Sequence, residues 1–210
     1  MGQIVLVRHG QASWGSADYD VLSPLGEHQA AVVGATLRGL APDLVVHGTM
    51  KRQQGTAELA VGAAGWDCET LVDDAWNEMD HLALLAAAPR HFDGEPDRQQ
   101  FQQWFEAATD RWVEGDCDAD YEESFPTFRK RVLAALDRLA DAGTAVVFTS
   151  GGPIAAVTSA LLDGGRPAYR KLAPVVVNSS ITRVVSGRRG LTLLSFNEHS
   201  HLAAEQVTYR

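Results

Sequence analysis

The stretch IVLVRHGQAS, residues 4–13, sets four consecutive aliphatic residues directly before an Arg-His-Gly triplet. An aliphatic run of this length that ends near a glycine is typical of a strand buried on both faces of a parallel sheet. A second stretch, VVFTSGGPIAAV at residues 146–157, repeats the order of apolar run, small polar residues and glycine, with Ser150 in place of the histidine. The sequence therefore predicts two buried strands, each followed by polar residues.

Short aliphatic runs alternate with segments of helical periodicity along the chain, which indicates an α/β protein with a largely parallel sheet. Helices are expected to begin at Ser23-Pro24, after Thr49 as a cap, at Ser124, and at the Gly-Gly-Pro sequence that follows Ser150. Hydroxyl residues favour the N-cap and proline favours the first helical turn. Strands are predicted at residues 3–8, 44–47, 70–72 and 145–148, with a terminal hairpin formed by residues 180–185 and 191–196.

The length of the chain suits one compact domain, so we expect a single domain over residues 1–210. Between about residues 81 and 120 the chain is acidic and aromatic without strand alternation, which indicates a helical insertion beside the sheet. Residues 90–124 contain eleven acidic residues and three arginines, a net charge of −8. The aromatic residues Phe101, Trp104, Phe105 and Trp112 recur there at helical intervals, and we expect a packing face rather than a substrate cage.

The composition is that of an ordinary globular protein, with 45% hydrophobic and 21% charged residues. A formal net charge of −9 argues against binding to nucleic acid, because affinity for the phosphate backbone comes from cations. Cys68 and Cys117 have no metal-ligand spacing, and no secretory signal precedes the first strand. The uncharged run at residues 144–162 contains Gly-Gly-Pro and is expected to be a strand and a helix. We therefore expect a cytoplasmic protein without membrane or nucleic-acid partners; the sequence does not indicate an oligomeric state.

Polar residues follow several of the predicted strands at the end where open α/β sheets bind their ligands. Arg8-His9, residues 47–52 and Ser150-Gly151 all lie at such ends, so we expect them to converge. A guanidinium suits phosphate or carboxylate oxygens, and a glycine lets backbone amides approach an anion. A neutral imidazole beside such an anion site can attack the phosphorus of a bound ester. These residues alone are also compatible with a structural Arg-His pair.

The motifs LVRHGQAS at residues 6–13 and GTMKRQQGTAE at residues 48–58 resemble those of the histidine phosphatase superfamily, which has the phosphoglycerate-mutase-like fold. The resemblance extends over most of the chain. It implies a three-layer α/β/α sandwich with a mostly parallel central sheet. Further matching blocks are SPLG at 23–26 with Gln29-Ala30, ESF at 123–125, NSSIT at 178–182 and NEHSHL at 197–202.

The resemblance implies phosphoryl transfer through a phosphohistidine on His9, with Arg8 and Arg52 holding the phosphoryl oxygens and no metal or cofactor needed. For Arg52 a helix-surface cation is the alternative, and the neighbouring Lys51 is expected to face solvent. The general acid implied by the family pattern is Glu78. The acidic residues that compete with it in sequence are Asp73, Asp74 and Asp80.

Ser150 departs from the family pattern, which has a second histidine before the glycine at this strand end. Its hydroxyl, with Gly151 beside it, can still contribute to phosphate binding, but without a positive charge, at an expected cost of about 1–3 kcal/mol. His47 is a possible substitute cation, although a packed or solvent-facing histidine is the favoured interpretation. Ala12 and Gly15 also replace polar residues of the family pattern.

His199 and His201 alternate near the end of the chain, but no carboxylate or thiolate falls at ligand spacing, so no metal site is predicted. The sequence as a whole predicts a phosphomonoester hydrolase that acts on a small phosphorylated metabolite through a phosphohistidine. Two alternatives stay open. One is a phosphate-binding module of the same fold with low or no activity, which Ser150 permits, and the other is a phosphotransferase of the phosphoglycerate-mutase type.

Overall fold

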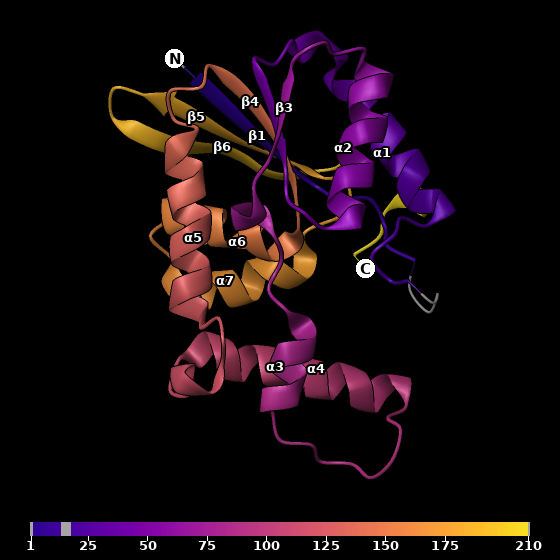
Figure 1. Cartoon of the computed structure of the whole chain (residues 1–210), viewed down its shortest axis with the longest axis vertical. Coiled ribbons are helices and arrows are strands. Elements are labelled where there is room, and N and C mark those ends of the chain that lie inside the picture. Colours follow the sequence, from indigo (N-terminus) through magenta and orange to yellow (C-terminus); the bar gives the residue numbers. More distant parts are fainter. Residues whose placement is uncertain (1, 14–17, 210) are drawn as a thin grey trace. The chain divides into compact units, whose positions relative to one another are not determined.

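The computed structural model describes residues 2–13 and 18–209 (Figure 1). The chain forms two compact units, one made of Met1–Glu78 with Val132–Arg210 and the other of Met79–Arg131. The first unit contains the sheet and all the residues that we predicted for the functional site.

A six-stranded sheet in the order β3-β2-β4-β1-β5-β6 confirms the predicted α/β architecture. The first four strands in this order are parallel to one another, and β5 and β6 form the predicted antiparallel hairpin at the other edge. The central pair, β1 and β4, are the two stretches whose apolar runs predicted buried strands. The strands are β1 (Gly2–Arg8), β2 (Leu44–His47), β3 (Glu69–Val72), β4 (Thr144–Thr149), β5 (Ile181–Gly187) and β6 (Gly190–Glu198).

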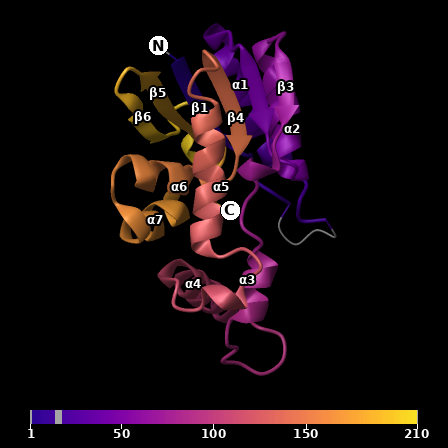
Figure 2. The same ribbon diagram turned by 60° about the vertical axis from the view of Figure 1, so that its left-hand side comes forward.

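Helices cover both faces of this sheet, as Figure 2 shows. Apolar side chains of α1 and α2 form one core with Val5, Val7 and Phe148, which alternate along their strands. On the opposite face α6 contacts β1 and β6. The result is the predicted three-layer α/β/α arrangement. Its helices are α1 (Pro24–Leu37), α2 (Lys51–Ala64), α6 (Gly151–Leu161), α7 (Gly165–Leu172) and, from Val132 onward, the end of α5 (Phe125–Arg138).

The starts of α1 and α2 show one correct prediction and one error. Ser23 caps α1, since its hydroxyl accepts a hydrogen bond from the Gly26 amide at 3.0 Å. The predicted cap of α2, Thr49, is wrong, because α2 begins after Met50, which makes no side-chain cap. Asn77 holds Thr49 instead, accepting from its amide and donating to its hydroxyl, both at 2.7 Å.

The second unit is helical and contains the segment predicted as an insertion. Its helix α4 begins at a capping box in which Asp97 and Gln100 bond each other's backbone amides. The aromatic side chains pack within the unit, as expected: Trp104 meets the Phe92 ring edge-on at 5.3 Å, and Trp112 meets Phe125 at 5.1 Å. The elements are α3 (His81–Ala87), α4 (Arg98–Glu114), a 3-10 turn (Asp118–Asp120) and the first part of α5.

Residues 144–162 form β4 and α6, as predicted from the Gly-Gly-Pro sequence within them. In the described part of the chain, no helix combines the length and the apolar character needed to cross a bilayer.

Candidate active site

The site lies at the carboxyl ends of β1 and β4, which are neighbouring parallel strands. Arg8 is in register with Thr149, and the amide of His9 donates to the Thr149 carbonyl at 2.8 Å. His9 and Ser150 are therefore the first residues after two neighbouring strands, at the same edge of the sheet. The structure thus brings together two of the polar segments that the sequence placed at strand ends.

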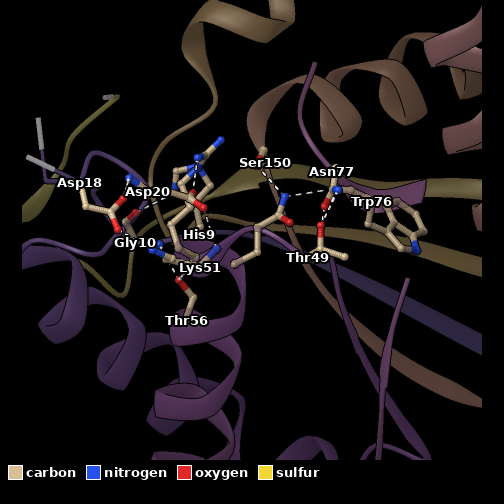
Figure 3. A network of polar contacts seen from close by, with 12 residues as sticks. His9, Gly10, Asp18, Asp20, Thr49, Lys51, Thr56, Trp76, Asn77 and Ser150 are labelled. Carbon is tan, nitrogen blue, oxygen red and sulfur yellow. Dashed lines mark hydrogen bonds and ion pairs between the residues drawn. The ribbon is translucent and has the colours of Figure 1, made fainter. Parts of the chain in front are cut away.

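The contacts of His9 define which ring nitrogen carries the proton (Figure 3). Nδ1 lies 2.7 Å from the Gly10 carbonyl, which only accepts, so Nδ1 is the donor. Nε2 receives a hydrogen bond from Nε of Arg52 at 3.2 Å, so Nε2 presents its lone pair. Burial lowers the pKa of His9 well below its usual range, and the charges of Arg52 and Arg8 lower that pKa further. His9 is therefore a neutral imidazole whose lone pair is on Nε2.

The backbone around His9 is fixed from several elements. Its carbonyl accepts from the side chain of Asn178 at 3.1 Å and from the Ser179 amide at 3.2 Å. Gly10 serves close packing: its amide donates to the hydroxyl of Thr56, and a Cβ built on Gly10 would lie 2.3 Å from the carbonyl oxygen of Gly26. The glycine of the triplet is thus required by the approach of α1. The sequence had suggested an anion-binding amide there.

Arg52, in the first turn of α2, points its guanidinium at His9. Its side chain is 7% exposed, and besides His9 it contacts Asp20, whose Oδ1 lies 2.5 Å from Nη1. The other oxygen of Asp20 accepts from the amide of Lys51 at 2.9 Å. Lys51 itself faces solvent, as predicted, with its side chain 64% exposed beside Asp18. The carboxylate of Asp20 at this cation was not predicted from the sequence.

Arg8 approaches from the side of α6. Its guanidinium donates to the carbonyl of Val176, while its buried Nε has no hydrogen-bond partner among the described residues. A Cβ built on Gly151 would lie 3.7 Å from that Nε. Burial lowers the pKa of Arg8 to about 10, and the charge of Glu78 opposes this change. Arg8 therefore stays charged at neutral pH and holds an unused donor beside Gly151, as a bound anion requires.

Glu78 lies against the N-terminus of α6, where its Oε2 accepts from the amide of Gly152 at 2.9 Å. A Cβ on Gly152 would come within 2.0 Å of the other carboxylate oxygen, so only glycine leaves room for Glu78 in this position. Tyr169 of α7 closes this side, and burial, with the charge of Glu78, raises the pKa of its phenol well above the usual value. The fold thus holds the carboxylate on the side of Arg8.

The three competing acids are placed differently. Asp73 is bonded to Arg138 at 2.6 Å and caps the turn at Ala75. Asp74 is exposed, and Asp80, in the second unit, caps α3. Of the four carboxylates, Glu78 is the one that bonds to α6.

Ser150 is fully buried, and its hydroxyl oxygen accepts from Nε2 of Gln53 at 2.8 Å. His47 is buried with Nδ1 2.7 Å from the Gly48 carbonyl. It lies on β2, separated from β1 by β4, so the structure does not set it beside His9. The packed histidine that we favoured is what the structure contains.

The remaining departures lie away from the imidazole or outside the described residues. Ala12 is buried and bridges to Leu22, and Gly15 falls in the part of the chain outside the described residues. His199 and His201 contact backbone carbonyls, those of Asn197 at 2.6 Å and Ser179 at 3.0 Å. Within residues 2–13 and 18–209 no cluster of three or more potential metal ligands occurs.

Comparison with known proteins gives a family and several relatives. The family model described as "Histidine phosphatase superfamily (branch 1)" matches residues 4–199. A relative from Enterobacter sp. (strain 638), named "Probable phosphoglycerate mutase GpmB", is 28% identical over 194 residues, which cover 88% of this chain and 85% of the relative.

Two solved structures show the same fold. A mutant phosphoserine phosphatase from Entamoeba histolytica in complex with phosphoserine is 21% identical, with a TM-score of 0.70 over 97% of this chain and 100% of the other. A mycobacterial glucosyl-3-phosphoglycerate phosphatase in complex with VO3 is also 21% identical, with a TM-score of 0.69 over 95% of this chain and 100% of the other. At these identities the likeness extends to the fold.

Proposed function

The chain belongs to the histidine phosphatase superfamily, branch 1, and on this premise we propose that it is a phosphomonoester hydrolase that acts through a phosphohistidine on His9. The substrate in this proposal is a small phosphorylated metabolite. The observation that carries the proposal is the state of His9: a neutral ring whose Nε2 lone pair faces Arg52, with the charged Arg8 at the same strand end.

In the first half-reaction, Arg8 and Arg52 hold non-bridging oxygens of the phosphoryl group, and the Ser150 hydroxyl and the Gly151 amide add neutral donors. The Nε2–P bond forms as the ester P–O bond breaks, and the leaving oxygen takes a proton from the carboxyl group of Glu78. Fixed cations stabilise the charge that develops on the phosphoryl oxygens, so catalysis is largely positioning and electrostatics.

In the second half-reaction, water attacks the phosphorus of phosphohistidine. One proton of the water passes to the Glu78 carboxylate, the N–P bond breaks with its electron pair returning to Nε2, and inorganic phosphate leaves. The enzyme is thereby restored to its starting state. All groups in both steps belong to the chain, the ester and water.

Two other functions of the same fold have specific support. A binding module with little turnover is favoured by Ser150, which replaces a histidine of the family pattern and is buried against Gln53. A phosphotransferase of the mutase type is favoured by the name of the relative from Enterobacter. The three functions differ in what happens to the phosphoryl group on His9: transfer to water, no formation, or return to the product.

The experiment is a panel of phosphomonoesters assayed for phosphate release with the wild type, His9→Ala and His47→Ala. His47 is a matched control, because it is also buried, lies at the end of a strand and has the same contact to a glycine carbonyl. We expect acid-labile label from a ³²P-ester on the wild type and on His47→Ala, and none on His9→Ala. Phosphate release that survives His9→Ala contradicts the proposal. Phosphate binding without labelling supports the binding module, and label that reappears in an isomeric ester supports the mutase.

We further propose a reducing, cytoplasmic setting. It is supported by Cys68 and Cys117, both of which are free thiols. A change in melting temperature on adding a reductant to the purified protein would contradict it.

A further inference from the structure

Gln53 is a fully buried amide between α2 and the end of β4. Its Nε2 donates to the Ser150 hydroxyl at 2.8 Å and to the Trp76 carbonyl at 3.1 Å (Figure 3). A backbone carbonyl only accepts, so the contact with Trp76 fixes which end of the amide is the nitrogen. It follows that Ser150 receives a hydrogen bond from Gln53.

This contact determines what the Ser150 hydroxyl can do. One lone pair of its oxygen is occupied by Gln53, so its hydrogen points elsewhere. The hydroxyl does not cap α6, although Ser150 is the N-cap residue. The described residues offer no acceptor for that hydrogen. The Ser150 hydroxyl is therefore oriented by Gln53 and keeps its hydrogen available for a ligand.

Ser150 lies at the end of the strand next to the one that carries His9. Two successive residues of α2 contact the two neighbouring strand ends, Arg52 reaching His9 and Gln53 reaching Ser150. Because β1 and β4 are parallel and in register up to Arg8, the two contacted side chains project from adjacent strands toward the same helix. The Ser150 hydroxyl is thus a neighbour of the phosphoryl site proposed above.

Gln53 also ties this donor to the segment that leads to Glu78. The Trp76 carbonyl that it contacts accepts a second bond from the hydroxyl of Thr149 at 2.6 Å, and the Trp76 side chain is buried. Glu78 follows two residues later. The Gln53 amide therefore connects Ser150, the residue after β4, with the loop segment that carries the proposed general acid.

The two ends of the Gln53 amide differ in their contacts. Its Oε1 is buried and has no hydrogen-bond partner among the described residues. A buried acceptor without a partner destabilises the folded state, and an apolar side chain of the same length avoids this. The donor function of Nε2 is what an apolar residue cannot supply.

We propose that Gln53 is a positioning residue for phosphoryl transfer, which donates to Ser150 so that the Ser150 hydroxyl donates to the phosphoryl group on its way to and from His9. The proposal rests on the proposed function of the site. It makes the Gln53–Ser150 pair the neutral counterpart of the histidine that the family pattern has at position 150. Gln53 acts through Ser150 and does not itself touch the phosphoryl group.

The test is a double-mutant cycle of Gln53→Met, Ser150→Ala and the double variant. Methionine keeps the length of the side chain and removes the donor. Each single variant is expected to lower kcat about fivefold to tenfold with KM nearly unchanged, because a neutral hydrogen bond to the transition state is lost. The double variant is expected to be no slower than Ser150→Ala alone. Gln54→Met, on the exposed side of the same helix, is the control and keeps the wild-type kcat.

Two results overturn the proposal: a wild-type kcat in Gln53→Met or in Ser150→Ala, or a double variant whose loss equals the product of the single losses. Melting temperatures are measured beside the kinetics. Should Gln53→Met fail to fold, Ser150→Ala alone decides, because a Ser150 that contributes nothing leaves Gln53 nothing to position.

Orthovanadate binding separates this proposal from the proposed function. Vanadate occupies the position of the transferring phosphoryl group, and its affinity can be measured by calorimetry without turnover. We expect its Kd to rise by the same factor as kcat falls in Gln53→Met and in Ser150→Ala. If the wild type hydrolyses no ester but the vanadate cycle shows this coupling, the proposed function fails, and Gln53 still positions Ser150 for binding the phosphoryl group. If hydrolysis depends on His9 and the vanadate Kd is unchanged in both variants, the proposed function stands and the role of Gln53 fails.

Discussion

Nε of Arg52 donates to Nε2 of His9 at 3.2 Å, so Nε2 is the unprotonated nitrogen of the ring. The same cation, together with burial, keeps the ring from taking up a proton. One contact therefore sets both the tautomer and the charge of the proposed nucleophile.

The stability of the protein is expected to depend on pH through His9. Its pKa in the folded protein is lowered well below 6.5, so the unfolded chain binds the proton first, and stability falls as the pH decreases below about 6.5. Between pH 7.5 and pH 5.5 the wild type is expected to lose more stability than His9→Gln does, on the order of 1 kcal/mol. Urea unfolding of both proteins at the two pH values measures this, and equal losses contradict the neutral buried ring.

Asp20 is expected to compete with bound anions for Arg52. Its carboxylate lies 2.5 Å from the guanidinium, so Asp20→Asn removes a negative charge next to the site while keeping an acceptor. The Kd for inorganic phosphate is expected to fall about threefold to tenfold. Asp18→Asn is the control, because Asp18 pairs with the exposed Lys51. Calorimetric titration with phosphate decides, and weaker binding by Asp20→Asn contradicts competition.

Gly152→Ala is expected to disable the proposed general acid by displacing its carboxylate. The added Cβ would lie 2.0 Å from Oε1 of Glu78, so the carboxylate has to leave the end of α6. We expect kcat to fall by more than about tenfold for alkyl phosphates, and much less for p-nitrophenyl phosphate, whose leaving group needs no proton. Gly62→Ala, where nothing lies within 4 Å of the added Cβ, is the control. Equal losses on both kinds of ester argue against this role of Glu78.

Restoring the histidine of the family pattern is expected to require two changes. Ser150 is fully buried with the amide of Gln53 at 2.8 Å, so an imidazole at this position is expected to clash with Gln53. Ser150→His alone is expected to lower kcat and the melting temperature, since overpacking a buried site costs about 1–3 kcal/mol. Ser150→His with Gln53→Ala is expected to recover kcat to the wild-type value or above. A fully active single variant contradicts this explanation.

Local chemistry in the sequence predicted most of the first unit. The apolar runs of β1 and β4 and the Ser23-Pro24 start of α1 depend on neighbouring residues, so the sequence alone shows them. Helix α7 was not predicted, because its eight residues include Gly165 and Pro167, and Tyr169 is its one buried residue. The cap at Thr49 was predicted wrongly, because Asn77, far along the chain, holds that residue.

The motifs led to the residues of the site, but their partners come from distant parts of the chain. Asp20 and Arg52 are 32 residues apart, and Gln53 and Ser150 are 97 apart. Neither pair has a spacing that a sequence pattern can register, because tertiary packing creates both. Gly152 illustrates the same limit: the sequence shows a glycine, and only the position of Glu78 shows why no other residue fits.

Glu78 is the last residue of the first compact unit, and Met79 is the first residue of the second. The proposed proton donor is therefore joined to the inserted segment by one peptide bond, whereas His9 and both arginines belong to the sheet and the first turn of α2. Replacing the insertion therefore changes the chain next to the proposed donor, whereas the proposed phosphate ligands belong to the first unit. Exchange of the insertion during evolution is thus expected to change the proposed leaving-group preference while the proposed nucleophile, His9, stays in the first unit.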